Sequence, residues 1–228
     1  MCGIFGYFAH PNGNMDLARV KAIARVTEAR GPHAFGFAWV DGKNRLRMFK
    51  QTGRISDHLG ILAMAADARM LIGHCRFATH GAPENNLNNH PHPCDGGWLV
   101  HNGVIGHHER LAEEHDLAPV TECDSEVLAL LIETAEGNLA DRVAEGVRLC
   151  ARSALATMAL WRSPARMVVA RANGQPLRMG QNRDGFYLAS LEKALPPGAR
   201  LLADDSLMTF RVEAGRAMAH ASALEIVV

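Results

Sequence analysis

A cysteine stands at position 2 of the 228-residue chain, directly after the initiator methionine. Initiator methionine is commonly removed when a small residue follows, and removal would leave Cys2 with both a thiol and a free α-amine. An α-amine titrates near pH ~8 and a thiol near ~8.5, so the amine can accept the thiol proton at little free-energy cost. Cys2 is therefore a candidate nucleophile with its own base, and the alternative is a buried cysteine without a catalytic role.

A second group of polar residues stands where an apolar stretch enters a loop. Residues 73–81 read Gly-His-Cys-Arg-Phe-Ala-Thr-His-Gly and place Arg76, Thr79 and His80 at this junction. A guanidinium there can hold a carboxylate through two parallel hydrogen bonds, and the alternative is a surface ion pair. The segment is a candidate binding site for an acidic group.

A third segment, His101-Asn102-Gly103, follows an apolar strand that ends at Val100. Asn102 offers a side-chain amide and Gly103 an unobstructed backbone N–H, which are the two donors of an oxyanion hole, although Asn-Gly pairs also form ordinary turns. Asp124 stands before a helical stretch and is either a ligand for a positive group or only an N-cap. Each of these signals is weak alone.

Six sequence blocks, in this order, resemble the glutaminase domain of class II glutamine amidotransferases, the N-terminal-nucleophile hydrolase family of glucosamine-6-phosphate synthase and amidophosphoribosyltransferase. The blocks are Cys2-Gly3-Ile4-Phe5-Gly6-Tyr7, Arg30-Gly31-Pro32 with Gly36, residues 73–81, Asn89-His90-Pro91-His92, His101-Asn102-Gly103-Val104-Ile105 and Asp124-Ser125-Glu126-Val127. Because they extend through most of the chain, the combination is far more specific than any single block.

The resemblance implies an enzyme that hydrolyses the side-chain amide of glutamine. Cys2 would attack the amide carbon, with its α-amine as base and then as acid for the departing ammonia. Asn102 and the N–H of Gly103 would stabilise the oxyanion. The resulting γ-glutamyl thioester on Cys2 would then be hydrolysed to glutamate.

The resemblance also implies how glutamine is held. Arg76, helped by Thr79 and His80, would bind the α-carboxylate, and Asp124 would bind the α-ammonium. Each charged end of the amino acid would thus meet its opposite. Supporting roles are implied for Arg30 and His101.

Several positions depart from the family pattern without removing a catalytic group. His33 stands where aspartate is usual, Cys75 and Phe77 replace threonine and tryptophan, and His107-His108 replaces a more typical acidic or Asn-Tyr pair. In the synthases the position of Phe77 lies near the path of ammonia, so tunnel closure or partner choice is expected to differ.

No metal and no cofactor are predicted. His90, His92 and Cys94 form an H-x-H-x-C pattern that could bind a metal ion, but the amidotransferase blocks explain this loop better. The sequence contains no glycine-rich phosphate loop. Its five cysteines are scattered without a CxxC pair, so reduced thiols are expected.

Composition favours a small-molecule substrate. The 24 basic side chains balance the 24 acidic ones, which gives no broad field for nucleic acid or for an acidic membrane. No signal pattern and no apolar run of the roughly 18 residues needed to span a bilayer is present. A soluble, cytoplasmic protein is expected.

Apolar periodicity predicts strands, then helices, then strands again. Strands are expected over residues 4–8, 35–40, 45–50, 70–77, 98–101, 154–160, 167–172, 186–190 and 207–212, and helices over 17–26, 56–66, 124–136 and 139–152. Turns are expected at Asp41-Gly42 and Asn173-Gly174. The pattern indicates an α+β fold with two stacked, largely antiparallel sheets covered by helices. The resemblance implies the four-layer αββα arrangement of N-terminal-nucleophile hydrolases.

Residues 1–228 are expected to form one glutaminase domain without a synthase domain, with Met1 removed. Ammonia would then pass to a separate synthase subunit or acceptor enzyme. One alternative is a stand-alone γ-glutamyl amide hydrolase of the same fold, with a leaving-group pocket shaped by the loop 81–97. A second is a non-catalytic glutamine-sensing or assembly module. The loops 30–36 and 81–97 are expected to move during turnover. The sequence leaves the acceptor and the oligomeric state open.

Overall fold

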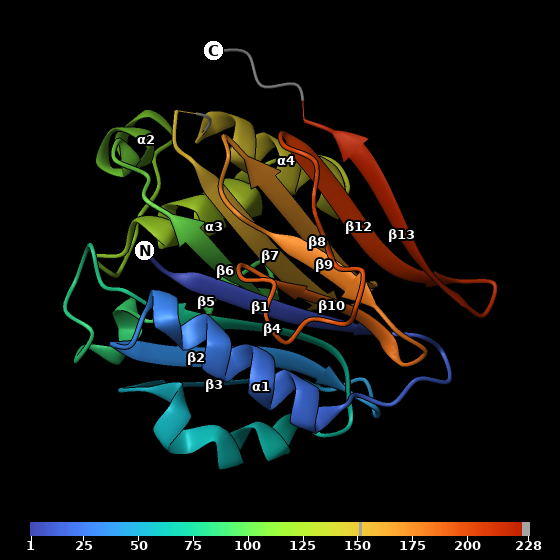
Figure 1. Cartoon of the computed structure of the whole chain (residues 1–228). Coiled ribbons are helices and arrows are strands. Elements are labelled where there is room, and N and C mark those ends of the chain that lie inside the picture. The colour runs from blue at the N-terminus through green and yellow to red at the C-terminus, as the bar shows by residue number, and fades with distance from the viewer. Residues whose placement is uncertain (151, 225–228) are drawn as a thin grey trace.

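Two antiparallel β-sheets are stacked face to face in the computed structural model, which describes residues 1–150 and 152–224 (Figure 1). The seven-stranded sheet has the order β11 (Arg200–Leu201), β9 (Arg178–Gln181), β10 (Gly185–Ala189), β1 (Gly3–Ala9), β4 (Ala68–Arg76), β2 (Ala34–Asp41) and β3 (Leu46–Thr52). The six-stranded sheet has the order β13 (Arg216–Ala223), β12 (Ser206–Glu213), β8 (Ala165–Ala172), β7 (Leu155–Arg162), β6 (Gly97–Gly103) and β5 (His92–Cys94).

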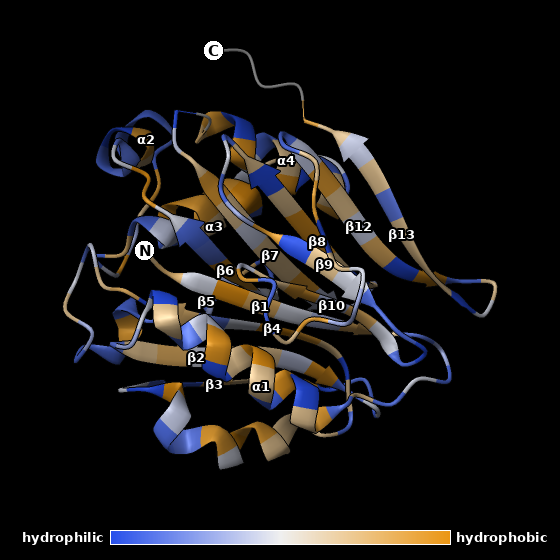
Figure 2. Ribbon diagram, viewed as in Figure 1, coloured by the Kyte–Doolittle hydropathy of each residue, from blue (hydrophilic) through white to orange (hydrophobic). Residues whose placement is uncertain are grey.

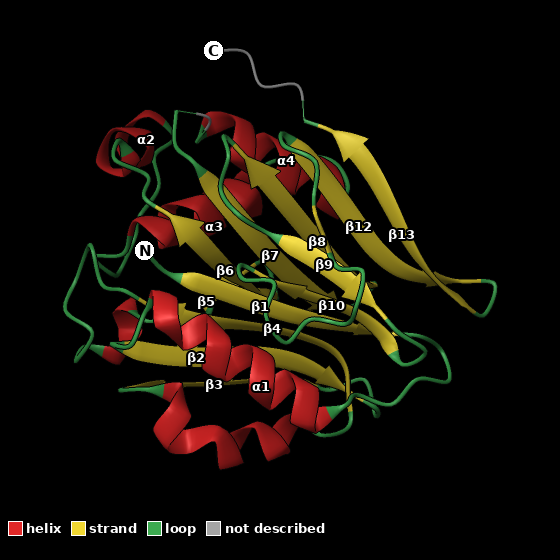
Figure 3. Cartoon of the chain, viewed as in Figure 1, coloured by secondary structure: helices red, strands yellow, loops and turns green. Residues whose placement is uncertain are grey.

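Helices cover the outer face of each sheet (Figure 3). The α-helices are α1 (Leu17–Thr27), α2 (His108–Glu114), α3 (Asp124–Thr134) and α4 (Leu139–Leu149), and the 3-10 helices are η1 (Glu28–Arg30), η2 (Ile55–Ala65) and η3 (Asn86–Asn88). Three apolar clusters separate the layers: one between the sheets, one between the seven-stranded sheet and α1 with η2, and one between the six-stranded sheet and α3 with α4. The predicted αββα arrangement is confirmed.

Strand β1 lies in the middle of the seven-stranded sheet and is apolar on both faces (Figure 2). Tyr7 packs in the helix-side cluster and the next residue, Phe8, in the cluster between the sheets, as the two-residue period of a strand requires. A Cβ atom at Gly6 would lie 2.8 Å from Met158 Sδ, so glycine here lets the sheets approach closely. This buried strand fixes the position of Cys2, which directly precedes it.

Most predicted elements are confirmed, with shifted ends. The helix predicted over 56–66 is the 3-10 helix η2, with a break at His58. Helices α3 and α4 end earlier than predicted, and residue 151, within the predicted 139–152 helix, lies outside the described residues. The sequence patterns missed β5, β9, β11, β13 and α2. Among the described residues, none of the helices combines the length and the hydrophobicity needed to span a bilayer.

The β2–β3 hairpin is closed by the Asp41 carboxylate and not by the predicted two-residue turn. Residues 42–45 form the loop, and the Asp41 carboxylate accepts hydrogen bonds from the backbone N–H groups of Lys43 and Arg45 at 2.9 Å each. Arg45 Nε donates to the same carboxylate at 2.7 Å. Burial opposes ionisation of Asp41, but these donors outweigh it and lower the pKa of the carboxyl group from 3.8 to about 2.

We expect Asp41 to make stability depend on acid pH. Because the pKa is lower in the folded chain than in the unfolded chain, the stabilisation is complete above pH ~5 and is lost as the pH falls from ~4 to ~2. Asp41→Asn should therefore lower the free energy of unfolding at pH 7 by about 1–2 kcal/mol, and the difference from wild type should shrink below pH ~4. Urea unfolding at pH 7 and pH 3 measures both values. The exposed Glu136→Gln is the control, and an equal deficit at both pH values would contradict the prediction.

Candidate active site

The Cys2 thiol is held against the backbone at the end of β4. Pairing of β1 with β4 places Gly3 opposite Cys75, and continuation of this register places Cys2 opposite Arg76 and next to Phe77, which lies just beyond the strand. Cys2 Sγ accepts a hydrogen bond from the Phe77 N–H at 3.2 Å and donates to the Phe77 carbonyl at 3.3 Å. Arg30 Nε donates to the Cys2 carbonyl at 2.6 Å. The sulfur therefore has a defined position, and Arg30 supports it through the main chain.

Burial raises the pKa of the Cys2 thiol. The Phe77 N–H, the positive N-terminus and Arg76 lower this pKa in part, and Asp124 raises it further. The side chains of Arg76 and Asp124 are therefore within electrostatic range of the sulfur. The thiol is therefore protonated at neutral pH and needs a base. Met1 is 68% exposed, so the bond that would be cut to free the Cys2 amine lies at the surface.

Arg76 is a buried cation whose hydrogen-bond partners are neutral. It is the last residue of β4 and is 2% exposed. Its guanidinium donates to Asn89 Oδ1 at 2.8 Å, to the Gly81 carbonyl at 2.9 Å and to the His80 carbonyl. No carboxylate of the described residues forms a salt bridge with it. A buried, uncompensated positive charge attracts an anionic ligand group.

Asp124 joins the start of α3 to the end of β6. It is the first residue of α3, and the interpretation as an N-cap is wrong because Cys123 occupies that position. Asp124 Oδ2 accepts a hydrogen bond from the Ile105 N–H at 2.7 Å, and Oδ1 lies 4.0 Å from His80 Nδ1. The buried carboxylate is thus fixed between the predicted oxyanion segment and the predicted binding loop.

The end of β6 carries a buried amide without a partner. Asn102 is 1% exposed, and among the described residues neither its side-chain oxygen nor its side-chain nitrogen has a hydrogen-bond partner. Its backbone carbonyl accepts from Gln175 Nε2 at 3.1 Å, which fixes the strand end. Buried polar groups are normally paired, so an unpaired amide is the arrangement expected of a ligand-binding group.

The neighbours of Asn102 are fixed by close packing. His101 Nδ1 lies 2.8 Å from Ser125 Oγ, so this histidine ties β6 to α3 as a supporting residue. A Cβ atom at Gly103 would lie 2.5 Å from the Ala154 carbonyl oxygen, which excludes any larger residue without a backbone shift. Glycine is therefore required at this position by space.

Thr79 and His80 line a cavity of about 500 Å³, and His80 is also the residue that lies 4.0 Å from the Asp124 carboxylate. Thr79 is exposed, and the ring of His80 packs edge-on against His108 with centroids 4.9 Å apart. The cavity is bordered by residues of the loop 79–81, of α2 and of the segment before α3: Thr79, His80, Gly81, His108, Glu109, Ala112, Pro119, Thr121, Glu122, Cys123 and Val127. The structure thus brings His80 to the site and leaves Thr79 at its rim.

Comparison with known proteins agrees with this geometry. No family model matches the chain. Glutamine–fructose-6-phosphate aminotransferase from Vibrio parahaemolyticus is 34% identical over 209 residues, which is 86% of this chain and 32% of that protein. The same enzyme from Escherichia coli K12 is 33% identical over 214 residues, 88% of this chain and 33% of that protein. The chain belongs to the class II glutamine amidotransferases. It spans about a third of the length of these relatives.

Solved amidotransferase structures share the fold. Glutamine phosphoribosylpyrophosphate amidotransferase from B. subtilis superimposes with a TM-score of 0.78 at 23% identity, over 100% of this chain and 50% of that one. A glutamine aminotransferase class-II domain protein from Silicibacter pomeroyi gives a TM-score of 0.63 at 17% identity, over 96% of this chain and 98% of that one. The two-sheet α+β fold predicted from the resemblance is therefore confirmed.

The structural roles of some residues around the candidate site were not predicted. His33, which stands where the family has aspartate, accepts a hydrogen bond from the Ala78 N–H through Nδ1 at 3.1 Å, and its ring lies 4.8 Å from that of Phe77. Sequence analysis missed the roles of the Phe77 backbone, of Ser125 and of Gln175. These are ordinary residue types far apart in the chain, and only the fold brings them to the catalytic segments.

Proposed function

We propose that this domain hydrolyses the side-chain amide of glutamine and delivers ammonia to a separate synthase or acceptor enzyme. The observation that carries the proposal is the presence in one domain of a fixed thiol at Cys2 and a buried amide at Asn102 that is unpartnered among the described residues. A nucleophile and an oxyanion donor are the two groups that amide hydrolysis needs most. The family relationship supports glutamine as the substrate.

The reaction follows from these groups once Met1 is removed. The α-amine of Cys2 takes the thiol proton, and the sulfur attacks the amide carbon of glutamine. Asn102 Nδ2 and the Gly103 N–H stabilise the tetrahedral oxyanion, and the protonated amine gives its proton to the departing nitrogen, which leaves as ammonia. Water then attacks the thioester, the thiol leaves with a proton, and glutamate is released.

The charges at the other end of the site fit a free amino acid. Arg76 supplies a positive charge for the α-carboxylate and Asp124 a negative charge for the α-ammonium. Some donors of Arg76 are engaged by the carbonyls of residues 80 and 81. A carboxylate accepts stronger hydrogen bonds than a carbonyl, so we expect glutamine to displace this loop from the guanidinium.

The first experiment is labelling with 6-diazo-5-oxo-L-norleucine, an alkylating analogue of glutamine. We expect one label per chain on an N-terminal Cys2, located by intact and peptide mass spectrometry. Glutamine should protect the thiol, and glutamate should protect it less. A processed chain that stays unlabelled would contradict glutamine as the substrate and favour a larger γ-glutamyl compound.

We expect Asp124→Asn to raise the KM for glutamine by about 10–100-fold, because a hydrogen bond to a charged group contributes roughly 1.5–3 kcal/mol. The asparagine oxygen can still accept the Ile105 N–H, so the fold is retained and kcat should change little. Steady-state glutaminase kinetics measure both constants. Glu122→Gln, an exposed change at the same cavity, is the control and should leave KM within about twofold. An equal rise in KM in Asp124→Asn and Glu122→Gln would mean that Asp124 does not bind the α-ammonium.

A further inference from the structure

Three buried histidines that the proposed reaction does not use, His74, His90 and His92, lie near Arg76. His74 and His90 are stacked with ring centroids 3.8 Å apart, and His92 packs edge-on against His90 at 4.6 Å. His74 Nε2 lies 3.0 Å from the His101 carbonyl, so His74 has a structural partner. Among the described residues, both ring nitrogens of His90 and Nε2 of His92 have no hydrogen-bond partner.

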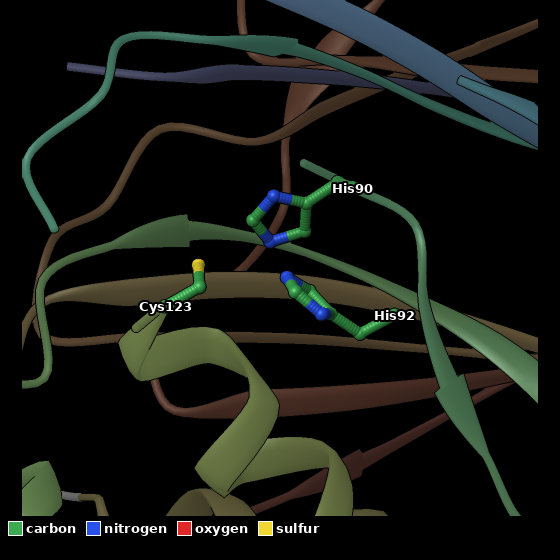
Figure 4. A group of neighbouring side chains, drawn as sticks. All are labelled: His90, His92 and Cys123. Carbon is green, nitrogen blue, oxygen red and sulfur yellow. The ribbon is translucent and has the colours of Figure 1, made fainter. Parts of the chain in front are cut away.

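His90, His92 and Cys123 point toward one another (Figure 4). One ring nitrogen of each histidine and the cysteine sulfur all lie within 4.8 Å of one another. The histidines come from the start of β5 and the residues before it, and Cys123 is the N-cap residue of α3. The sulfur lies 3.8 Å from Asp124 Oδ1 and is also hydrogen-bonded by Ser125. A metal ion would replace these weak contacts of a thiol with a bond to a thiolate.

The imidazole nitrogens are buried without hydrogen-bond partners. His90 is 3% exposed and His92 is 1% exposed, and within the part of the chain that the structure describes His90 Nδ1, His90 Nε2 and His92 Nε2 are unpaired. A neutral imidazole always has one N–H donor and one acceptor nitrogen, and leaving them unpaired in the interior is unfavourable. Coordination of a cation would satisfy the acceptor nitrogens that face the cluster.

We propose that His90, His92 and Cys123 form a binding site for Zn²⁺. Two imidazoles and a thiolate are a donor set that zinc prefers, and with three protein ligands the fourth tetrahedral position stays open. Zn–N bonds of ~2.0–2.1 Å and a Zn–S bond of ~2.3 Å place neighbouring donors about 3.5 Å apart. Side-chain rotations that bring the donors about 1 Å closer would therefore complete the site.

Charges and access around the three residues are compatible with a cation. Lys50 Nζ is held by the carbonyls of Asn89 at 2.7 Å and Pro91 at 3.4 Å, and Arg76 lies on the other side of Asn89. Ionisation of Cys123 on binding releases one proton and supplies a negative charge against these cations. Asp124 and Glu126 add two further carboxylates at the start of α3. Cys123 borders the cavity of about 500 Å³, which provides a route for the ion.

The test is zinc binding by the full chain, freed of metal and measured by equilibrium dialysis against Zn²⁺ with metal analysis. We expect one Zn²⁺ per chain. Cys123→Ala should weaken the affinity by at least roughly tenfold, because it removes a ligand, whereas Cys94→Ala should leave it unchanged. Cys94 is the matched control because it is equally buried and stands in the H-x-H-x-C pattern, but its sulfur contacts the Ala129 carbonyl at 3.5 Å.

A spectroscopic measurement separates this site from zinc held by the Cys2 thiol. Co²⁺ in place of Zn²⁺ should give a thiolate charge-transfer band that disappears in Cys123→Ala and persists in Cys2→Ala. If Cys123→Ala does not fold, as judged by circular dichroism, His92→Gln takes its place and should lose the same affinity. Absence of a one-to-one complex, or full affinity in the folded Cys123 or His92 variant, would overturn the site.

Discussion

Replacing Cys2 with alanine is expected to abolish glutamine hydrolysis, with kcat lower by at least roughly 10⁴-fold, because only binding and oxyanion stabilisation would remain. Labelling by 6-diazo-5-oxo-L-norleucine should disappear with it. Among the described residues, the hydrogen-bond partners of the thiol are the backbone N–H and carbonyl of Phe77, so the variant should fold with a nearly unchanged melting temperature. Ammonia release under saturating glutamine is the measurement, and retained turnover would exclude Cys2 as the nucleophile.

A second variant tests whether the α-amine of Cys2 is the base. A lysine inserted between Met1 and Cys2 prevents removal of the methionine and keeps the thiol while its nitrogen stays in a peptide bond. Burial raises the pKa of the Cys2 thiol, so a thiol without its base should be nearly as inactive as Cys2→Ala. Met1 is largely exposed, which leaves space for the added residue. Activity close to that of the processed protein would show that another group takes the proton.

Several segments of the candidate site could be placed from the sequence because they adjoin apolar strands. The run Ile4–Phe8 indicated a buried strand, and the structure places Cys2 at its start and Arg76 at the end of the neighbouring β4. What the sequence could not provide is the pairing between segments. The Asp124 carboxylate reads as a helix cap from its position, yet it bonds to Ile105, 19 residues earlier.

The contact of Cys123 with His90 and His92 is another pairing between segments that the sequence could not predict. The H-x-H-x-C spacing suggested Cys94, which shares a face of β5 with His92 by alternation. A strand rises ~3.3 Å per residue, so Cys94 lies about 6–7 Å farther along and reaches Ala129 in the middle of α3. Cys123, the N-cap residue of that helix, lies beside the histidines where the sequence pattern had suggested Cys94. The sequence separation of these residues hides this contact from pattern analysis.

Elements without a strong apolar period were missed for a related reason. Helix α2 is short and buries only Leu111 and Ala112, and β13 is a mostly exposed edge strand that exists through its pairing with β12. Their secondary structure depends on tertiary contacts more than on local preference. Both elements lie far from Cys2 in the sequence. Helix α2 nevertheless borders the cavity beside His80 through His108 and Glu109, so a sequence analysis that misses α2 also misses part of the wall of this cavity.

Asn102→Ala should lower kcat for glutamine by about 10²–10³-fold, as expected for loss of one oxyanion donor worth roughly 2.7–4 kcal/mol. The effect should fall on kcat more than on KM, because the donor acts on charge that develops only in the transition state. The remaining N–H of Gly103 explains why the expected loss is smaller than for Cys2→Ala.

The same variant separates catalysis from stability. Asn102 makes no side-chain hydrogen bond with another described residue, so its truncation should leave no partner unpaired and should reduce the melting temperature by only a few degrees. Asn102→Asp keeps the shape but replaces the donor with an acceptor, and should be at least as inactive as the alanine variant because a carboxylate would repel the oxyanion. A kcat within about threefold of wild type in Asn102→Ala would instead place the oxyanion elsewhere and remove the reason for this buried amide to stay unpaired.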